Sequence, residues 1–377
     1  MINFNIPCMI GAEAHNIRKV ILSKNFSGDG NFTKKCHKWL EKKLGCKKAL
    51  LTTSCTHALE MAAILVNIKK GDEIIMPSYA FASTANAFVL RGARIVFVDI
   101  RPDTMNIDEK LIGQAITSKT KAIVVVHYAG VSCEMDTIIA IAKKYNLFII
   151  EDAAQGVMSR YKGKYLGTIA DIGCYSFHET KNLHCGEGGA IVLNKEQFFD
   201  RAEIIREKGT NKTQFLRGLV DKYTWVDIGS SYLPSELNAA FLYSQFQHAN
   251  SILKYRLKIW NLYYDSGLSE LAAKGFIELP NVPKHCDHNA HIFYIKVKNL
   301  RERINLIEFL KRNNIVTAFH YLPLHSSLAG KIFARFHGDD KWTTRESERL
   351  LRLPLFYGLK DYHAQRVAKT ITDFFCR

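Results

Sequence analysis

Lys181 lies between a predicted strand at 171–176 and a glycine-rich turn at 186–189. A lysine amine that burial keeps neutral can act as a nucleophile and can move protons, so this residue is a candidate for catalysis. The glycines allow positive φ and a close approach of the backbone to a ligand. Taken alone, the segment fits an exposed lysine ahead of an ordinary turn better.

Asp152 follows directly after a predicted strand at 147–151, of which 147–150 are apolar. A carboxylate at the end of a buried strand loses much of its water, so it needs a cation or several hydrogen-bond donors nearby to stay ionised. A protonated pyridine nitrogen is one such cation. The alternative is structural: Asp152 would cap the N-terminus of a following helix.

A third signal comes from hydroxyl groups and free backbone N–H groups where a strand at 49–53 meets a helix at 56–66. Ser54, Cys55 and Thr56 lie at this junction, and the start of a helix attracts a phosphate through its orphan N–H donors and its dipole. Simple helix capping by one of the hydroxyls explains the same residues. Tyr79 and Phe81 follow the next strand and fit either the core or a platform on which a ring stacks.

Short apolar strands alternate with amphipathic helices through the first half of the chain. The expected strands lie at 49–53, 73–76, 94–99, 122–126, 147–151, 171–176 and 190–194. Strands that are apolar on both faces and alternate with helices predict an α/β fold with a mostly parallel central sheet flanked by helices. Ligands bind beyond the carboxyl ends of such strands, which is where Ser54, Tyr79, His127 and Asp152 lie in this pattern.

The regular alternation of predicted strands and helices ends before residue 266, and a different pattern follows. Strands at 290–297 and 315–319 and helices at 301–313 and 360–375 predict a smaller C-terminal α+β domain. We therefore divide the chain into a large domain at 1–245 and a small domain at 246–377, linked by a long helix at about 235–265. The polar and aromatic segment 209–232 has weak periodicity, and we expect a long loop there, which suggests a functional role.

Composition excludes several classes of protein. The net charge of +16 would attract polyanions, but the lysine pairs are dispersed and lack the interleaved aromatics of a nucleic-acid groove. We expect no nucleic-acid partner and attribute part of the charge to attraction of a diphosphate substrate. Nine cysteines without a CxxC pair favour reduced thiols over a disulfide framework or a metal site. The N-terminus resembles no signal sequence and no apolar run reaches membrane-spanning length, so we expect a cytoplasmic protein.

The motifs EDAAQ at 151–155, SFHETKN at 176–182 and GEGG at 186–189 stand in the order and register of the DegT/DnrJ/EryC1/StrS aminotransferases. The chain resembles this family from about residue 2 to 376. The resemblance implies a fold-type I aminotransferase that uses pyridoxal 5′-phosphate (PLP) and L-glutamate to aminate a nucleotide-linked keto-sugar. It also implies a homodimer with shared active sites.

Roles follow from the resemblance residue by residue. Lys181 would hold PLP covalently and shuttle protons, and Asp152 would keep the ring nitrogen protonated. Gln155 would contact the ring hydroxyl and Phe81 would stack on the ring, with Tyr79 as a substitute. The phosphate would lie against Ser54, Cys55, Thr56 and Ser176, as well as Ser231 from the partner subunit, although many relatives carry an asparagine at that last position. A branch that dehydrates its substrate has a histidine in place of the lysine, so Lys181 favours transamination.

Further candidates for substrate binding lie in two places. Lys212, Tyr223 and Trp225 belong to the 209–232 loop and would reach the site of a partner subunit. His320 and His325 belong to the small domain and would face the sugar, with core or capping roles as the alternative. We expect no metal ion at the site.

Overall fold

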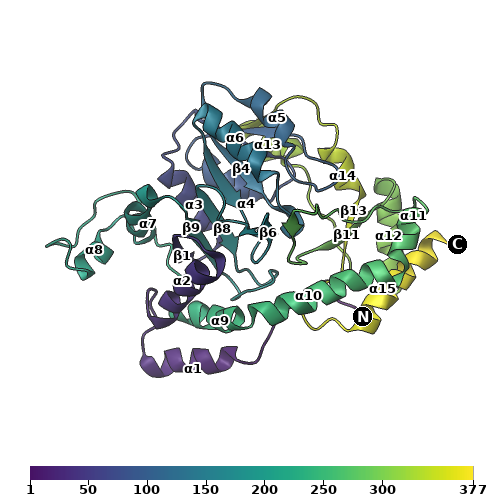
Figure 1. Cartoon of the computed structure of the whole chain (residues 1–377), viewed down its shortest axis with the longest axis horizontal. Helices are drawn as coiled ribbons and strands as arrows, with labels where there is room; N and C mark the ends of the chain where they lie inside the picture. The colour runs from purple at the N-terminus through teal and green to yellow at the C-terminus, as the bar shows by residue number, and fades with distance from the viewer. Residues whose placement is uncertain (377) are drawn as a thin grey trace.

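The computed structural model describes residues 1–376 and is built around an eight-stranded sheet with the strand order β1-β9-β8-β5-β4-β2-β3-β12 (Figure 1). Every pairing is parallel except those of β9, which runs against both β1 and β8. The prediction of a mostly parallel sheet is confirmed. The strands are β1 (Lys48–Thr52), β2 (Glu73–Pro77), β3 (Arg94–Val98), β4 (Thr120–Val126), β5 (Phe148–Asp152), β8 (Ile172–Ser176), β9 (Gly189–Leu193) and β12 (Ala334–Phe336).

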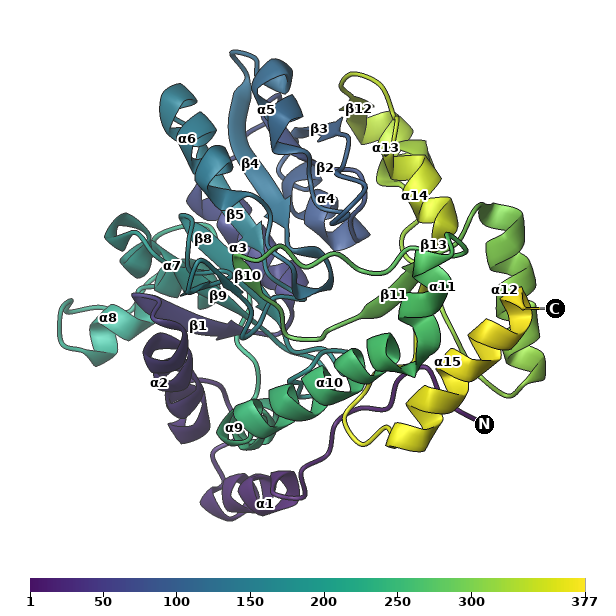
Figure 2. The same cartoon turned by 45° about the vertical axis from the view of Figure 1, so that its right-hand side comes forward.

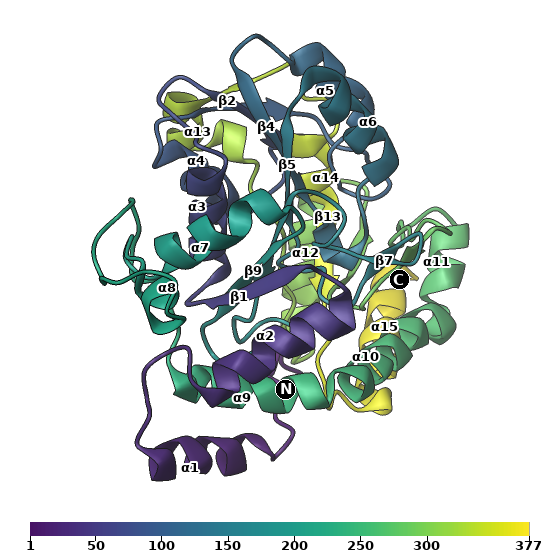
Figure 3. The ribbon, with the colours of Figure 1, turned by 60° about the vertical axis from the view of Figure 1, so that its left-hand side comes forward.

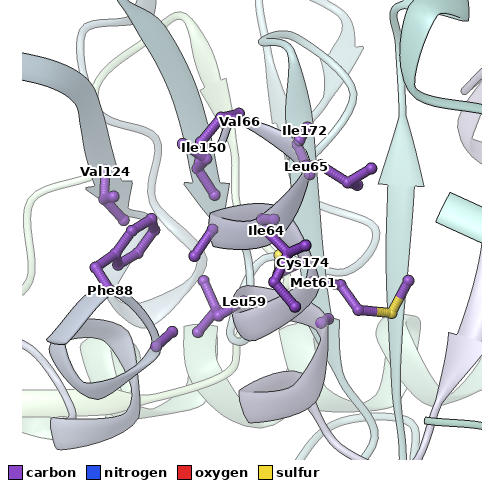
Figure 4. Packing of buried hydrophobic residues seen from close by; sticks show 14 of the residues in the cluster. Leu59, Met61, Ile64, Leu65, Val66, Phe88, Val124, Ile150, Ile172 and Cys174 are labelled. Carbon is purple, nitrogen blue, oxygen red and sulfur yellow. The ribbon is translucent and has the colours of Figure 1, made fainter. Parts of the chain in front are cut away.

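Helices cover both faces of this sheet, and its strands are therefore buried along almost their entire length. One face packs against α3 (Cys55–Leu65), α4 (Ala82–Val89) and α7 (Phe199–Arg206). Figure 4 shows Leu59 and Ile64 of α3 among Val124, Ile150 and Ile172 of the strands. The other face packs against α5 (Glu109–Ala115) and α6 (Met135–Tyr145), and at the β1 end against α2 (Asn31–Leu44) and α9 (Glu236–Gln247).

The C-terminal part has its own core around the antiparallel pair β11 (Phe293–Lys296) and β13 (Leu350–Leu353). Its helices gather on one side of the molecule (Figure 2): α10 (Ala249–Tyr263), α11 (Ser269–Ala273), α12 (Leu300–Arg312), α14 (Thr343–Arg349) and α15 (Asp361–Phe375). Two segments cross the predicted domain boundary at residue 245. The division of the chain into two domains stays a prediction. Ile2 pairs with Ile315 and joins the C-terminal core, and β12 pairs with β3 of the large sheet.

The remaining elements are short or peripheral. They are α1 (Glu13–Ser23), which packs along α9, the three-stranded sheet of β6 (Arg160–Tyr161), β7 (Lys164–Tyr165) and β10 (Cys286–Asp287), the helix α13 (Leu328–Phe333) and α8 (Lys212–Leu216). Among residues 1–376 no helix has the length and apolar character that crossing a bilayer requires.

Two expectations about elements were wrong, and a third, the long loop at 209–232, holds in part. The helix expected at 235–265 is two helices, α9 and α10, with a break at His248, whose φ of −109° and ψ of 10° are not helical. The helix α9 packs on the large core, whereas α10 starts in that core with Ala249 and Ile252 and continues into the small core with Ile259, Trp260 and Tyr263. The segment 315–319 forms only the isolated bridges of Ile315 and Ala318, and the segment 209–232 contains α8 within its loop.

Candidate active site

A cavity of about 690 Å³ lies where the parallel strands of the large sheet end, and the C-terminal part closes its opposite wall. Val126, Asp152 and Ser176, the last residues of β4, β5 and β8, line one side. Ile292 and Arg352 belong to the other side. Of the predicted site residues, those that line the cavity are Ser54, Cys55, Thr56, Phe81, Asp152, Gln155, Ser176, Lys181 and His320.

Lys181 follows β8 and its backbone N–H donates to His178 O over 2.9 Å. Its side chain opens to the cavity, and within residues 1–376 its amine makes no hydrogen bond or ion pair. Desolvation by the surrounding protein lowers the pKa of this amine; Arg352 lowers it further, whereas Cys55 and Asp152 raise it. A lysine held toward its neutral form and left without a partner can attack a carbonyl and can accept a proton.

Asp152 and Glu151 are adjacent carboxylates that point to opposite faces of β5. Asp152 faces the cavity, where its oxygens accept from Thr84 Oγ1 at 2.6 Å and from the Ala154 N–H at 3.1 Å. These two bonds leave lone pairs of the carboxylate available to a further donor inside the cavity. Ala154 lies two residues on and no helix follows β5, so this bond belongs to a turn and the alternative, in which Asp152 caps a helix, does not hold.

Glu151 has no exposed surface and is bound by four donors. It accepts from the backbone N–H groups of Gly167, Ile169 and Ala170 and from His127 Nε2, at 2.6 to 3.0 Å. His127 in turn accepts from Cys133 N through Nδ1, which places its proton on Nε2. The expectation that His127 faces the site was wrong, because it is buried behind the strand as a partner of Glu151.

The N-terminus of α3 opens into the cavity. Ser54 Oγ accepts from His57 N at 3.1 Å, so Ser54 caps the helix, while Cys55 and Thr56 begin it and lie in the first turn, whose N–H groups have no acceptor within the helix. Gly189 of β9 lies against this turn: a Cβ at Gly189 would come within 2.4 Å of Cys55 N. The glycine therefore lets β9 support the start of α3 at close range.

The aromatic residues expected near the site separate into one in the cavity and one in the core. Phe81 is 61% exposed at the start of α4 and lies 6.3 Å from the ring of Tyr321. Tyr79 is fully buried and donates to His320 O, so it does not reach the cavity. Gln155 accepts from Ala129 N and donates to the Tyr321 hydroxyl, which leaves one of its N–H groups free.

This arrangement fits PLP. The cavity offers an unpaired amine for an aldehyde, a buried carboxylate for a pyridine nitrogen, and helix N–H groups for a phosphate, at three separate positions of its wall. The volume is ample for the cofactor and part of a substrate. Within residues 1–376 no group of three histidine, cysteine or acidic side chains could hold a metal ion.

Several predicted residues lie away from the cavity of this single chain. Ser231 is exposed in an isolated bridge with Glu207, and Lys212 forms an ion pair with the same glutamate at 3.2 Å. Tyr223 and Trp225 are exposed on the loop that carries α8, and this loop extends away from the sheet (Figures 1 and 3). The prediction that these four residues reach the site of a partner subunit stays a prediction.

His325 was predicted to face the sugar but lies outside the cavity. Its Nδ1 is 2.7 Å from Ser78 Oγ and its Nε2 is 3.1 Å from Asp340 Oδ2. The order resembles a hydrolytic triad, yet Ser78 has no exposed surface, so its hydroxyl cannot attack a substrate. His325 joins the end of β2 to the segment before α14.

Sequence patterns did not identify several residues of the cavity wall, among them Thr84, His291 and Arg352. Thr84 follows Phe81 in a helix and looks like any small polar helix residue. His291 accompanies the strand predicted at 290–297, and its position ahead of the apolar run was the one available signal. Arg352 interrupts the apolar run 350–355, and nothing local shows what it faces.

Comparison with known proteins agrees with this geometry. The family model of the DegT/DnrJ/EryC1/StrS aminotransferases matches residues 7–372. The spore coat polysaccharide biosynthesis protein SpsC of Bacillus subtilis is 32% identical over 88% of this chain and 86% of its own, and GDP-perosamine synthase of Escherichia coli O157:H7 is 28% identical over 98% and 97%. The PMP-form of the putative sugar aminotransferase Spr1654 from Streptococcus pneumoniae superposes with a TM-score of 0.88 at 25% identity, covering 99% of both chains.

Proposed function

This chain belongs to the DegT/DnrJ/EryC1/StrS aminotransferase family, and we propose that it transfers the amino group of L-glutamate to a nucleotide-linked 4-keto-sugar. It has the fold of the fold-type I PLP aminotransferases and is a PLP-dependent sugar aminotransferase. The observation that carries the proposal is the single cavity that holds an unpaired amine at Lys181, a carboxylate at Asp152 and the N-terminus of α3.

The proposed chemistry assigns different tasks to these groups. PLP, when bound, supplies an aldehyde that bonds to amines and a ring that withdraws electrons from the adjacent carbon. Asp152 would hold the ring nitrogen positive, oriented by its bonds to Thr84 and Ala154. Lys181 Nζ would remove the proton from the α-carbon of glutamate and, in the second half of the cycle, deliver a proton to the sugar carbon that receives nitrogen. A lowered pKa suits an amine that does both near neutral pH.

For the sugar, we propose dTDP-4-keto-6-deoxy-D-glucose, which would yield dTDP-4-amino-4,6-dideoxy-D-galactose (dTDP-fucosamine) and 2-oxoglutarate. The support is the resemblance of the segments 77–93, 206–211 and 221–233 to the transaminase that makes this product for surface polysaccharide, such as lipopolysaccharide or enterobacterial common antigen. The alternative is a different nucleotide keto-sugar or the other C4 epimer. The similarity to GDP-perosamine synthase favours a GDP-linked sugar as the second candidate.

A homodimer belongs to the same proposal. The loop that carries α8 exposes several large apolar side chains, among them Leu216, Leu219 and Trp225, each at least 69% exposed. Such a group of side chains in water is typical of a protein interface. A second copy that covers this loop would also bring Lys212, Tyr223 and Ser231 toward a neighbouring cavity.

The test is product analysis. Purified protein is incubated with PLP, L-glutamate and either dTDP-4-keto-6-deoxyglucose or its GDP-linked 4-keto counterpart, and the aminated sugar is identified by NMR. We expect an axial 4-amino group on the dTDP sugar. An equatorial group or turnover of the GDP sugar alone would select the alternative, and no turnover of any keto-sugar would refute the proposal.

Lys181→Ala serves as the control for chemistry at this cavity. Losing a positioned acid–base group lowers the rate by roughly 10² to 10⁴-fold, whereas Lys110→Ala, on the exposed side of α5, leaves the rate unchanged. Wild-type turnover by Lys181→Ala would rule out the assigned role.

A further inference from the structure

His291 lines the cavity from the C-terminal part, just ahead of β11. Its Nδ1 lies 2.9 Å from Oδ1 of Asn182, the residue that follows Lys181 in the chain. The orientation of the Asn182 amide is fixed, because its N–H₂ group donates to Asn289 O at 2.8 Å. An amide oxygen can only accept a hydrogen bond, so the His291 ring carries a proton on Nδ1.

The other ring nitrogen, Nε2, is a bare acceptor. Burial lowers the pKa of His291 well below its usual value, and the charge of Lys181 lowers it further, so the ring is neutral at physiological pH. No donor within residues 1–376 reaches Nε2, and the atom is not enclosed by protein, so its lone pair opens into the cavity. An acceptor in a desolvated wall loses free energy unless a ligand supplies the donor.

Both backbone groups of His291 are also bound, so the ring has a fixed position. The N–H donates to Asn289 Oδ1 at 3.1 Å, and the carbonyl accepts from Arg256 Nη2 at 2.9 Å. The Asn289 amide donates in turn to Gln155 O and Val157 O, each at 2.8 Å. An acceptor held in this way discriminates between ligands, because it cannot turn away from one that lacks the matching donor.

His320 lines the same cavity but differs from His291 in this respect. Its Nδ1 lies 3.4 Å from the hydroxyl of Tyr128, which can donate or accept, so the chain imposes neither tautomer on it. His291 is thus the histidine of this wall whose free nitrogen the chain has set as an acceptor.

We propose that Nε2 of His291 accepts a hydrogen bond from the sugar hydroxyl on the carbon beside the reacting carbonyl, and so selects keto-sugars that carry this hydroxyl. The inference rests on the proposed function, in which Lys181 acts at the sugar carbon that receives nitrogen. For a 4-keto-6-deoxy sugar the group is the C3 hydroxyl, because C5 carries the ring oxygen and the methyl group instead.

The charges around His291 favour a hydroxyl over other donors that could enter the cavity. Besides burial, the cations Lys181, Arg256 and Arg352 all depress the pKa of the ring. An ammonium group would be repelled by these cations, whereas a hydroxyl donates a hydrogen bond without adding charge. Lys181 has the largest effect of the three, so a group bound to Nε2 lies near the atoms on which Lys181 acts.

The experiment removes the acceptor from the enzyme and the hydroxyl from the substrate, separately and together. PLP-loaded wild type, His291→Phe, His291→Gln and His15→Phe each receive dTDP-4-keto-6-deoxyglucose or its 3-deoxy analogue, and kcat/KM is measured for both. If wild type aminates the GDP-linked sugar alone, the GDP-linked pair is used. We expect wild type to prefer the hydroxylated sugar by roughly 10- to 100-fold, the effect of leaving a buried acceptor unpaired.

His291→Phe has no acceptor and should lose this preference, while its half-reaction with L-glutamate, measured without sugar, should match wild type. His291→Gln should keep part of the preference, because its amide oxygen reaches about as far as Nε2. His15 is exposed on α1, so His15→Phe should behave as wild type. Nitrogen-15 NMR of the cofactor-free protein, with the signal assigned by its absence in His291→Phe, should show a neutral ring protonated at Nδ1.

Equal kcat/KM for the two sugars in wild type, or an undiminished preference in His291→Phe, would overturn the inference. A ring protonated at Nε2 would do so too, as would an equal loss in the half-reaction with glutamate, which would make His291 a general support of the site. If His291→Phe does not fold, His291→Leu replaces it. A wild type that reacts with glutamate but aminates no keto-sugar would refute the proposed function and this inference with it, whereas one that aminates both sugars alike refutes this inference alone.

Discussion

At the scale of single residues, Glu151 and Asp152 carry the same carboxylate group, but their burial and hydrogen-bond partners give them different roles. Glu151 has all its acceptor capacity used by four donors from the chain, which makes it part of the fold. Asp152 keeps lone pairs free in the cavity. The difference arises because successive side chains of a strand point to opposite faces.

Substitution of these two carboxylates should separate catalysis from stability. Asp152→Asn should keep the bond from Thr84 but lose the charge, and we expect the rate of a single turnover to fall by roughly 10²- to 10³-fold. Glu151→Gln would place an amide N–H₂ against N–H donors and should lower the free energy of unfolding by about 2–4 kcal/mol. Thermal melting and single-turnover kinetics of both variants check this. Equal loss of activity in both would contradict the assignment.

The pKa of Lys181 gives a second prediction at this scale. Desolvation and Arg352 lower it below the ordinary 10.5, so the fraction of free amine rises with pH through a midpoint below that value. Competitive labelling of the cofactor-free protein with acetic anhydride, followed by mass spectrometry, measures this midpoint. Asp152→Asn should lower the midpoint further, because the carboxylate stabilises the ammonium form, and Arg352→Gln should raise it. A wild-type midpoint at or above 10.5 would contradict the burial argument.

At the scale of elements, the site depends on how closely β9 approaches the start of α3. The backbone of Gly189 occupies space that a side chain would need, opposite Ser176 in the β8–β9 pair. The glycine-rich turn thus has a packing role beyond its freedom of φ, since Gly189 lets β9 lie directly against the first turn of α3.

Gly189→Ala should therefore disturb the site without touching a catalytic group. Its Cβ would lie 2.3 Å from Ser54 C, so the first turn of α3 must move. We expect at least tenfold weaker binding of PLP and a loss of about 1–3 kcal/mol in stability, typical of overpacking. Gly113→Ala is the matched control, because nothing lies within 4 Å of its Cβ and it sits in α5, where alanine is preferred. Fluorescence titration with PLP and thermal melting compare the two, and wild-type PLP affinity in Gly189→Ala would contradict the argument.

At the scale of the whole molecule, the cavity exists only because two cores meet. Its polar groups come from the edge of the large sheet and from β13 of the C-terminal part, and the first residues of the chain, Phe4 and Asn5, complete the wall. The loop carrying α8 extends away from both cores and exposes apolar side chains (Figure 3). We propose that a second chain covers it.

Light scattering should give a mass near twice the 42.9 kDa of one chain. Leu219→Asp places a charge on an exposed apolar side chain of the loop and should shift the mass toward the monomer while lowering activity with the sugar. Tyr362→Asp, at a similarly exposed position on α15, should leave the mass unchanged. A monomeric wild type, or a dimeric and fully active Leu219→Asp, would contradict the proposed interface.

Sequence alone identified the alternation of strands and helices, the mostly parallel sheet and the positions of Lys181, Asp152 and the 53–56 turn. These follow from local patterns, because hydrophobic periodicity defines each element and the carboxyl ends of parallel strands meet at one edge. The motifs that carry the family resemblance lie in the same short segments, so they too could be recognised without coordinates.

Only the tertiary structure decided the rest. It showed that His127 serves Glu151, that the 235–265 pattern breaks at His248, and that Arg352 lines the same cavity as Lys181 although it lies 171 positions later in the chain. Periodicity and spacing describe neighbours along the chain. Which charged group is left without a partner depends on contacts between distant segments, and these form only when the two cores pack together.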